Sequence, residues 1–130
     1  MSAPHPNLLV EHLGEVIVVT MKPEDFFDQQ MISIAKQELL DLVAAERPIK
    51  LIVSFKNVER FSSAFLGALV SLREHLRFHH AEAELKLCEL RPAHREVFRL
   101  VDPQQGLFKL YETVAEAFRA FQAGSAQQSE

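Results

Sequence analysis

A short apolar run followed by two serines is the feature that most constrains how this chain folds. Residues 51–55 read Leu-Ile-Val-Ser-Phe, and residues 58–69 continue as Val-Glu-Arg-Phe-Ser-Ser-Ala-Phe-Leu-Gly-Ala-Leu. The pattern predicts a buried strand, a tight loop and a helix whose first turn carries Ser62 and Ser63. The crevice beyond the carboxyl end of a central strand is a common docking place, and a helix N-terminus there favours an anion. We therefore expect the function to reside around these serines.

The segments on either side predict alternating strands and helices. Residues 8–10 and 16–19 are β-rich and flank Gly14, which can adopt the positive φ of a hairpin turn. Acidic residues after Pro23 would open a helix whose core face is Met31, Ile34, Ala35, Leu39 and Leu42. The helix after the serines has an apolar stripe of Leu66, Leu69, Val70 and Leu76.

The C-terminal third predicts two further strand–helix pairs. Residues 84–89 alternate as in a half-buried strand, and Pro92 begins a short helix whose core face would be Val97, Leu100 and Val101. Residues 107–111 form a last short strand, and Thr113 with Glu116 has the form of a capping box for a final helix. From Ala123 onward we expect the chain to fray.

The predicted element order, β-β-α-β-α-β-α-β-α, defines the fold class. Strand–helix–strand units require parallel neighbouring strands with right-handed crossovers, whereas the initial hairpin is antiparallel. We therefore expect an α/β fold with a mixed, mostly parallel sheet of four to five strands and about four helices. Residues 1–130 would form a single domain with a core over about 8–122 and loose ends.

The composition narrows the functional classes. The chain has 14 basic and 18 acidic residues and a net charge of −4, without a basic block. We therefore expect no nucleic-acid partner, and no membrane contact because no apolar run approaches the roughly 18 residues that span a bilayer. The start of the sequence lacks the regions of a signal peptide, and Cys88 is the only cysteine. A reducing, cytoplasmic setting is expected.

Reactive side chains give two alternatives to a binding protein. His75 and His79 would share a helix face, but no carboxylate–histidine motif accompanies them, so we expect no metal or cofactor. A small α/β enzyme would use Ser63 or Cys88 as nucleophile, with a histidine as base. His75 lies about 18 Å beyond Ser63 on a helix that rises about 1.5 Å per residue, and no Gly-x-Ser-x-Gly elbow is present. We expect no catalysis.

The element order, the length and the serine loop together resemble STAS domains, in particular the bacterial anti-sigma factor antagonists. In that family the loop reads roughly Val-x-x-Ile/Met-Asp-Ser-Ser/Thr-Gly-Leu-Gly, which aligns with residues 58–67. The Leu-Arg-Pro at 90–92, the Gly-Leu-Phe at 106–108 and the Tyr-Glu-Thr at 111–113 also match. The resemblance covers about residues 8–122.

The resemblance implies a role for each residue of the loop. Ser63 falls on the serine that the family's partner kinase phosphorylates. Ser62 stands where the family has Asp, Ala64 replaces a small hydroxyl residue, and Phe65 replaces a glycine that leaves the partner room. Two structural alternatives remain open: Ser63 as a simple N-cap, and Phe65 either in the core or exposed beside Phe61.

The implied function is a non-catalytic protein-interaction module. Its partner would be an anti-sigma factor or a serine kinase of the histidine-kinase-like ATPase class. Binding would use Phe61, Ser62, Ser63, Ala64 and Phe65, and phosphorylation of Ser63 would release the partner. The alternative is a divergent STAS scaffold, or a protein that associates with itself as a homodimer, without phosphorylation.

Overall fold

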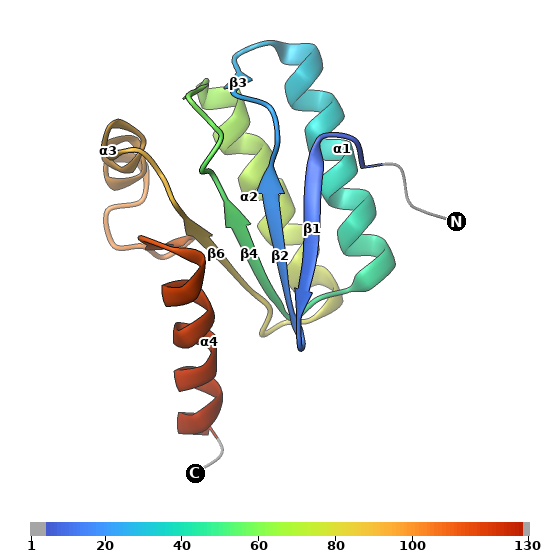
Figure 1. The fold of residues 1–130 in the computed structure, drawn as a ribbon, viewed down its shortest axis with the longest axis vertical. Coiled ribbons are helices and arrows are strands. Elements are labelled where there is room, and N and C mark those ends of the chain that lie inside the picture. Colours follow the sequence, from blue (N-terminus) through green and yellow to red (C-terminus); the bar gives the residue numbers. More distant parts are fainter. Residues whose placement is uncertain (1–4, 129–130) are drawn as a thin grey trace.

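A five-stranded mixed sheet in the order β1-β2-β4-β6-β7 forms the centre of the computed structural model, which describes residues 5–128 (Figure 1). Strand β1 (Leu8–Leu13) is antiparallel to β2 (Val16–Met21). Strands β4 (Lys50–Ser54), β6 (Glu84–Cys88) and β7 (Lys109–Tyr111) run parallel to β2. The predicted fold class is confirmed.

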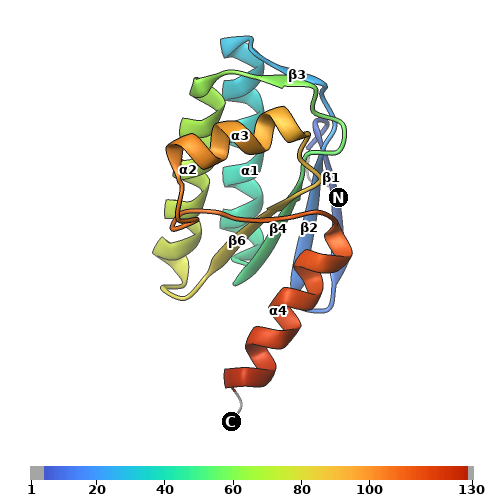
Figure 2. The same cartoon turned by 90° about the vertical axis from the view of Figure 1, so that its left-hand side faces the viewer.

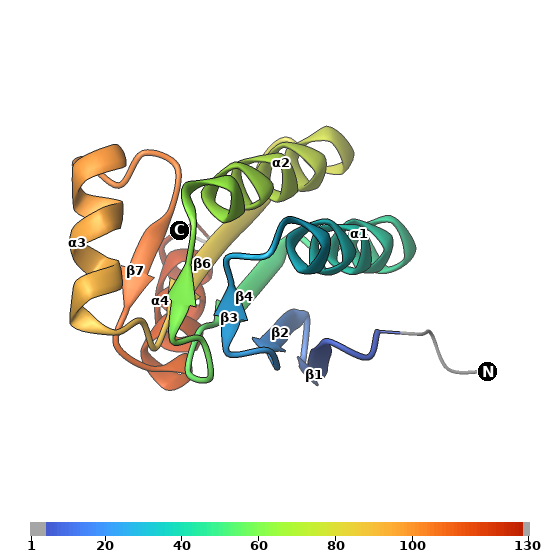
Figure 3. The same cartoon turned by 90° about the horizontal axis from the view of Figure 1, so that it is seen from above.

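The helices cover both faces of this sheet. Helices α1 (Gln29–Glu46) and α2 (Ser63–His79) pack side by side on one face, and α4 (Val114–Gln128) lies on the other (Figures 2 and 3). Helix α3 (Pro92–Val101) lies beside the edge strand β7 (Figure 3). The hydrophobic core accordingly has two parts, a large one under α1 and α2 and a smaller one under α4.

A separate pair of two-residue strands, β3 (Asp25–Phe26) and β5 (Arg60–Phe61), lies beyond the carboxyl edge of the sheet (Figure 1). The sequence did not predict this parallel pair, because two residues are too few for an alternation to be visible. The pair joins the chain before α1 to the loop before α2. It therefore fixes the serine loop against the rest of the molecule.

The first hairpin has the predicted turn. Leu13 pairs with Val16, so the turn consists of two residues, and Gly14 has a φ of 63°. A positive φ at the first turn residue but not at the second, Glu15, belongs to type II′, a hairpin turn whose twist matches that of the strands.

Helix α1 begins later than predicted, and its buried face is rotated. Asp28 is the N-cap, and its carboxylate accepts a hydrogen bond from the Met31 amide at 3.2 Å. Ile32 is in the core, whereas Ile34 is 42% exposed. Glu38 also lies on the buried face, because its carboxylate accepts from the backbone and side-chain nitrogens of Asn7 at 3.0 and 2.8 Å. The face of α1 was predicted from apolar residues alone, so the buried acid Glu38 could not be assigned to it.

The predicted core face of α3 is wrong. Leu100 and Val101 are 82% and 57% exposed, and Val97 is only partly buried. His94 and Phe98 face the core instead. The Phe98 ring lies 5.9 Å from that of Phe61 and 5.8 Å from that of Phe108, and this aromatic packing decides how the short helix is rotated.

Strand β6 is buried on both faces rather than half-buried as predicted. Lys86 is only 4% exposed on the α4 face. Its ammonium lies 4.4 Å from the centre of the Phe121 ring and 5.2 Å from that of Tyr111, and 3.3 Å from Glu84 Oε1. The ion pair and the two ring faces compensate for the desolvation of the charge, so this lysine attaches α4 to the sheet.

The predicted capping box is present at the start of α4, except that the Glu116 carboxylate bonds one residue earlier in the chain than the capping residue Thr113. Thr113 Oγ1 accepts from the Glu116 amide at 3.0 Å, and the Glu116 carboxylate accepts from the Glu112 amide at 3.0 Å. The helix continues to Gln128, past Ala123 where fraying was expected. Loose ends were predicted on both sides of residues 8–122, and of these ends residues 1–4 and 129–130 lie outside the described residues.

One carboxylate organises the loop between α3 and β7. Asp102 accepts hydrogen bonds from the amides of Gly106, Leu107 and Phe108 at 2.9, 3.0 and 3.0 Å. Partial burial acts to raise the pKa of Asp102, but the three amides and the nearby Arg73 charge outweigh it, so the pKa is lowered.

Replacing Asp102 with Ala is expected to destabilise the fold by about 1–2 kcal/mol at pH 7, since hydrogen bonds to a charged group are lost. A lowered folded-state pKa means that this contribution is fully present above the unfolded-state pKa, near 3.8, and is lost as the pH falls through the folded-state value. Urea unfolding at several pH values measures it: the gap between the two proteins closes in acid. Asp41→Ala, on the exposed side of α1, is the control and should change stability by under about 0.5 kcal/mol. An Asp102→Ala gap that is independent of pH would contradict this account.

Six phenylalanine rings connect the loop before α2 with the core. Phe65 is fully buried and stacks on Phe26, with ring centres 4.4 Å apart and planes inclined by 16°. The other members, each within 6.3 Å of a ring in the group, are Phe55, Phe61, Phe98 and Phe108.

Truncating Phe65 to Ala is expected to cost about 3–5 kcal/mol, because the change opens a cavity among packed rings. Urea or thermal unfolding would measure the loss. Phe78 lies on the same helix and is 83% exposed, so Phe78→Ala is the matched control, with a change within about 0.5 kcal/mol. Equal losses in the two variants would show that the ring stack does not carry this stability.

Candidate functional site

The loop after β4 is held by buried side chains and by backbone hydrogen bonds. Phe55 and Val58 are fully buried, and the Val58 amide donates to the Phe55 carbonyl at 2.9 Å. Arg60 and Phe61 then pair with β3, and the Ser62 amide donates to the Phe26 carbonyl at 3.2 Å. The loop therefore reaches α2 along a defined path at the carboxyl edge of the sheet.

The two serines occupy adjacent but different positions. Ser62 is the N-cap of α2, yet its hydroxyl does not cap the helix and instead donates to the Phe26 carbonyl at 3.4 Å. Ser63 is the first residue of the helix and is exposed. Within residues 5–128 its hydroxyl has no hydrogen-bond partner. The N-cap position is therefore one residue earlier, at Ser62, and the alternative in which Ser63 is a simple N-cap is wrong.

The structure decides between the two alternatives for Phe65. Its ring is fully buried, so the predicted direct contact of Phe65 with a partner is incompatible with this structure, and the core alternative is correct. Phe61 is partly buried between Phe65 and Phe98, and Ala64 is exposed. A Cβ placed on Gly67 would meet no atom within 4 Å, so the surface one turn beyond Ser63 is open.

The ring of Phe27 is exposed next to the loop, and the sequence did not indicate this residue as part of the site. It is 52% exposed and follows Phe26, the residue opposite Phe61 in the two-stranded pair. The guanidinium of Arg60 lies 4.9 Å from the centre of its ring. Only the pairing of β3 with β5 brings Phe27 to the site, so nothing local in the sequence indicated it.

Two ion pairs set the charge around the loop. Arg60 Nη2 lies 2.6 Å from Asp25 Oδ2, and this bond, with the Phe27 amide, lowers the pKa of Asp25. On the other side, Arg91 lies 3.5 Å from Glu59 and its Nε donates to the Val58 carbonyl at 3.1 Å. Arg60 and Arg91 therefore each already have an acidic partner.

His94 packs under the loop from α3. Its ring centre lies 4.5 Å from that of Phe61, and the residue is only 9% exposed. Burial lowers the pKa of His94, a hydrogen bond with the Glu59 backbone opposes this, and the Arg91 charge adds to the lowering. The side chain therefore supports the loop as a neutral ring at neutral pH.

Neither candidate nucleophile is activated among the described residues. Cys88 is fully buried, and burial together with the Glu89 charge raises the pKa of its thiol to about 12. Ser63 has no histidine or carboxylate in hydrogen-bond contact within residues 5–128. An unactivated hydroxyl and a protonated thiol are weak nucleophiles.

The remaining sequence candidates do not converge on a metal or a membrane. His75 contacts the Ser71 carbonyl at 3.0 Å through Nδ1. No group of three His, Cys, Asp or Glu residues in the described part of the chain could hold a metal ion. Within the same residues, no helix is both long enough and apolar enough to cross a bilayer.

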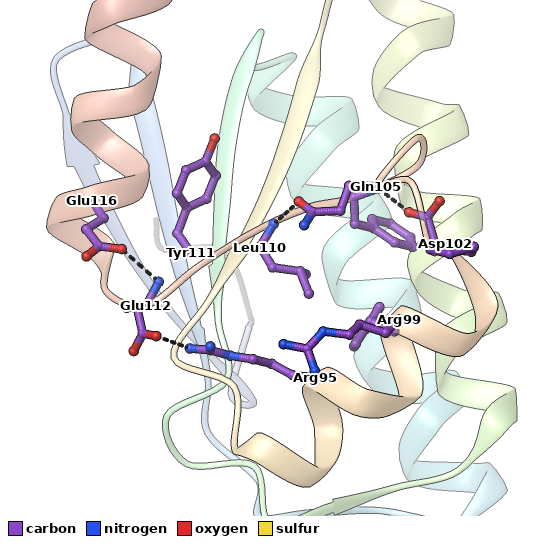
Figure 4. A pocket seen from close by; sticks show the side chains of 11 residues that line it. Arg95, Arg99, Asp102, Gln105, Leu110, Tyr111, Glu112 and Glu116 are labelled. Carbon is purple, nitrogen blue, oxygen red and sulfur yellow. Dashed lines mark hydrogen bonds and ion pairs between the residues drawn. The ribbon is translucent and has the colours of Figure 1, made fainter.

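A cavity of about 270 Å³ lies between α3, the following loop, β7 and the start of α4 (Figure 4). Arg95 reaches Glu112 at 2.9 Å across it, and Gln105 accepts from the Leu110 amide of the edge strand at 3.2 Å. Its acidic side chains, Asp102, Glu112 and Glu116, are each engaged within the fold. The cavity is therefore distinct from the serine loop.

The comparisons with known proteins agree with this geometry. The model of the STAS domain family matches residues 8–117. An anti-sigma factor antagonist from Mycobacterium paratuberculosis has a similar structure, with a TM-score of 0.74 and 27% identity over 92% of this chain and 97% of that one. No curated protein matches by sequence.

More distant structures share the fold. An anti-sigma-factor antagonist (STAS) domain protein from Planctomyces limnophilus is 20% identical, with a TM-score of 0.70 over 87% of this chain and 95% of that one. The anti-sigma factor antagonist SpoIIAA in its unphosphorylated form is 16% identical, with a TM-score of 0.63 over 88% and 97%. The predicted resemblance is confirmed, and the chain belongs to the STAS domain family.

Proposed function

We propose that this protein is a non-catalytic interaction module that acts like an anti-sigma factor antagonist. It docks onto a partner through the loop after β4 and the first turn of α2. The partner is an anti-sigma factor or a serine kinase of the histidine-kinase-like ATPase class, and the two meet in the cytoplasm. The family and the similarity to structures of anti-sigma factor antagonists support this class of function.

The exposed hydroxyl of Ser63 is the observation that carries the proposal. It stands at the first position of α2, with small or absent side chains at Ala64 and Gly67 beside it. Side chains this small let a partner approach the helix backbone closely. Phe27, exposed next to the loop, supplies an aromatic contact of the type that anchors interfaces.

A phosphate on Ser63 would release such a partner while leaving the fold intact. It adds about −1.5 to −2 charges and three acceptor oxygens. The free amides and the positive end of the helix dipole accommodate that charge within the fold. A partner packed on Ala64 and Gly67 would have to accommodate the same charge or dissociate.

Ser62 favours a second candidate, a STAS scaffold or a self-associating protein without phosphorylation. The family has a carboxylate at this position, whereas the Ser62 hydroxyl is bonded back to the Phe26 carbonyl. No acid of the loop is then placed beside Ser63 to orient its hydroxyl. In this alternative the same surface binds, and it binds permanently.

Phosphorylation is tested by incubating the protein with ATP and a purified serine kinase of the histidine-kinase-like ATPase class. We expect a single phosphate, mapped by mass spectrometry to Ser63, and no incorporation in Ser63→Ala. Ser62→Ala should still be labelled, because the Ser62 hydroxyl faces Phe26. A partner that binds the protein but leaves Ser63 unlabelled would remove the switch and support the scaffold.

The docking surface is tested by a charge at Ser63. Ser63→Asp is expected to weaken partner binding by about tenfold or more, since a buried unpaired charge at an interface costs over about 1.4 kcal/mol. Isothermal titration calorimetry measures the affinity. Ala44→Asp, at an exposed residue near the C-terminal end of α1, introduces a negative charge at the opposite edge of the sheet and should bind normally. Equal affinities for both variants would place the interface elsewhere.

A further inference from the structure

Strand β1 forms an open edge of the sheet (Figures 1 and 3). The opposite edge strand, β7, has only three residues and lies beside α3, whereas β1 has six residues and pairs only with β2 in the described part of the chain. Proteins usually protect such an edge with a lysine, a proline or a bulge. Between Leu8 and Leu13 there is no lysine or proline, and the pairing with β2 has no inserted residue. This edge is therefore able to pair with a further strand.

The hairpin determines which backbone groups of β1 point outward. Along an antiparallel pair, the residues of one strand bond alternately toward the partner strand and away from it. The Asn7 carbonyl accepts from the first amide after β2 at 3.0 Å, so Asn7 and every second residue after it bond to β2. Leu8, Val10 and His12 therefore direct their N–H and C=O groups outward. The Leu8 amide donates to the His5 carbonyl at 3.1 Å, and within residues 5–128 the other outward groups have no partner.

Apolar side chains flank this edge on both faces of the sheet. Leu9 and Leu13 are 48% and 42% exposed on the face opposite α1. Ile34, one turn before the Glu38 that bonds to Asn7, is also exposed on this side of α1. On the α1 face, a hollow of about 310 Å³ lies beside the strand and is lined by His5, Leu8, Val10, Leu42, Ala45 and Glu46. The edge thus offers unpaired backbone groups together with apolar contacts, which are the two components of strand addition.

We infer that β1 pairs with β1 of a second copy of this chain, antiparallel about a two-fold axis, so that the two five-stranded sheets become continuous. The occupant is a second copy because β1 supplies what its own edge requires. It brings outward backbone groups at every second residue, Val10 for the face with the hollow and Leu9 for the other face. After this pairing only the β7 edges remain, each beside α3, so the assembly ends at two copies.

The backbone pattern and the charges select one register. Only residues with outward groups form hydrogen-bonded pairs, so Val10 can face Leu8, Val10 or His12 of the second copy. Pairing with Leu8 needs the Leu8 amide, which is already engaged. Pairing with His12 puts the two Glu11 carboxylates directly opposite each other, and like charges there are destabilising. With Val10 facing Val10, these two residues exchange both hydrogen bonds, each His12 amide reaches a Leu8 carbonyl, and Leu9 lies against the aliphatic stem of Glu11.

This surface is separate from the serine loop. It uses the edge of β1 and the adjoining side of α1, whereas the loop lies before α2 at the carboxyl edge of the sheet (Figure 1). The inference does not rest on the proposed function. It also differs from the self-associating candidate above, in which the serine loop itself would be the contact.

Sedimentation velocity of the full chain at several concentrations tests the inference. We expect the mass to rise from that of one copy to that of two over about 5–500 μM, the range of a micromolar dissociation constant. In NMR spectra of the ¹⁵N-labelled chain, raising the concentration should shift amides centred on residues 8–13 and leave Ser63 unchanged.

Two substitutions at the edge should separate the copies. Val10→Pro removes an outward amide that β2 does not use, and it is expected to weaken dimerisation by about tenfold or more. Leu9→Glu places a carboxylate opposite Glu11 of the second copy and should also weaken it by about tenfold. Phe78→Glu, at an exposed ring on α2, is the matched control and should dimerise normally. Thermal unfolding confirms that each variant is folded, and Leu9→Glu keeps the test valid if Val10→Pro is not.

Single cysteines test the register. In Val10→Cys the two introduced residues would face each other with Cα atoms about 5.5 Å apart, within the roughly 4.4–6.8 Å that a disulfide spans. We therefore expect a cross-linked dimer on mild oxidation. In Glu11→Cys the two cysteines lie diagonally, about 7–8 Å apart, and should cross-link poorly. The wild-type chain is the baseline, because its Cys88 is buried.

Three results would overturn the inference. These are a single copy at every concentration, a dimer that persists in both Val10→Pro and Leu9→Glu, and faster cross-linking of Glu11→Cys than of Val10→Cys. A single copy whose β1 amides shift when an extended valine-rich peptide is added would identify a foreign strand as the occupant. Because Ser63→Asp should dimerise like the wild type, failure here and failure of the proposed function are distinguishable.

Discussion

The placement of the serine loop depends on one residue, Phe26, which contacts α2 in two ways. Its ring stacks on Phe65 at 4.4 Å, and its carbonyl accepts from both the amide and the hydroxyl of Ser62. The two-residue strands β3 and β5 could not hold the loop alone, because so short a pair is not stable by itself. Ring stacking supplies the hydrophobic energy, and the two hydrogen bonds set the orientation. Together they leave Ser63, the first residue of α2, exposed to solvent.

This arrangement explains how the fold accepts phenylalanine where the family has glycine. A side chain at this position could point toward the partner or into the core. The ring of Phe65 lies between Phe26, Phe55 and Phe61, within 5.9 Å of each, and contributes nothing to the exposed surface. The room that the family provides with glycine is preserved here at Ala64 and Gly67. The departure from the family pattern is therefore a change of the core rather than of the proposed docking surface.

The sequence predicted those features that arise from local patterns repeated over several residues. The sheet, the four helices, the Gly14 turn and the capping of α4 all carry such patterns, and they were predicted correctly. The rotations of α1 and α3 were not, because single residues decide them. Glu38 is buried through its bonds to Asn7, 31 residues away, and Phe98 is drawn inward by rings from other elements. The pairing of β3 with β5, which brings Phe27 to the site, is likewise visible only in three dimensions.

The two ends of α2 differ in chemistry, and their separation makes them electrically independent. The first turn is neutral and small, whereas Arg73 and Arg77 make the other end cationic. Charges in water are screened over about 8 Å at physiological ionic strength, which is less than the roughly 15 Å between Ser63 and Arg73 along the helix. A charge added at the first turn would therefore act on whatever packs there and would leave the cationic end of the helix unaffected.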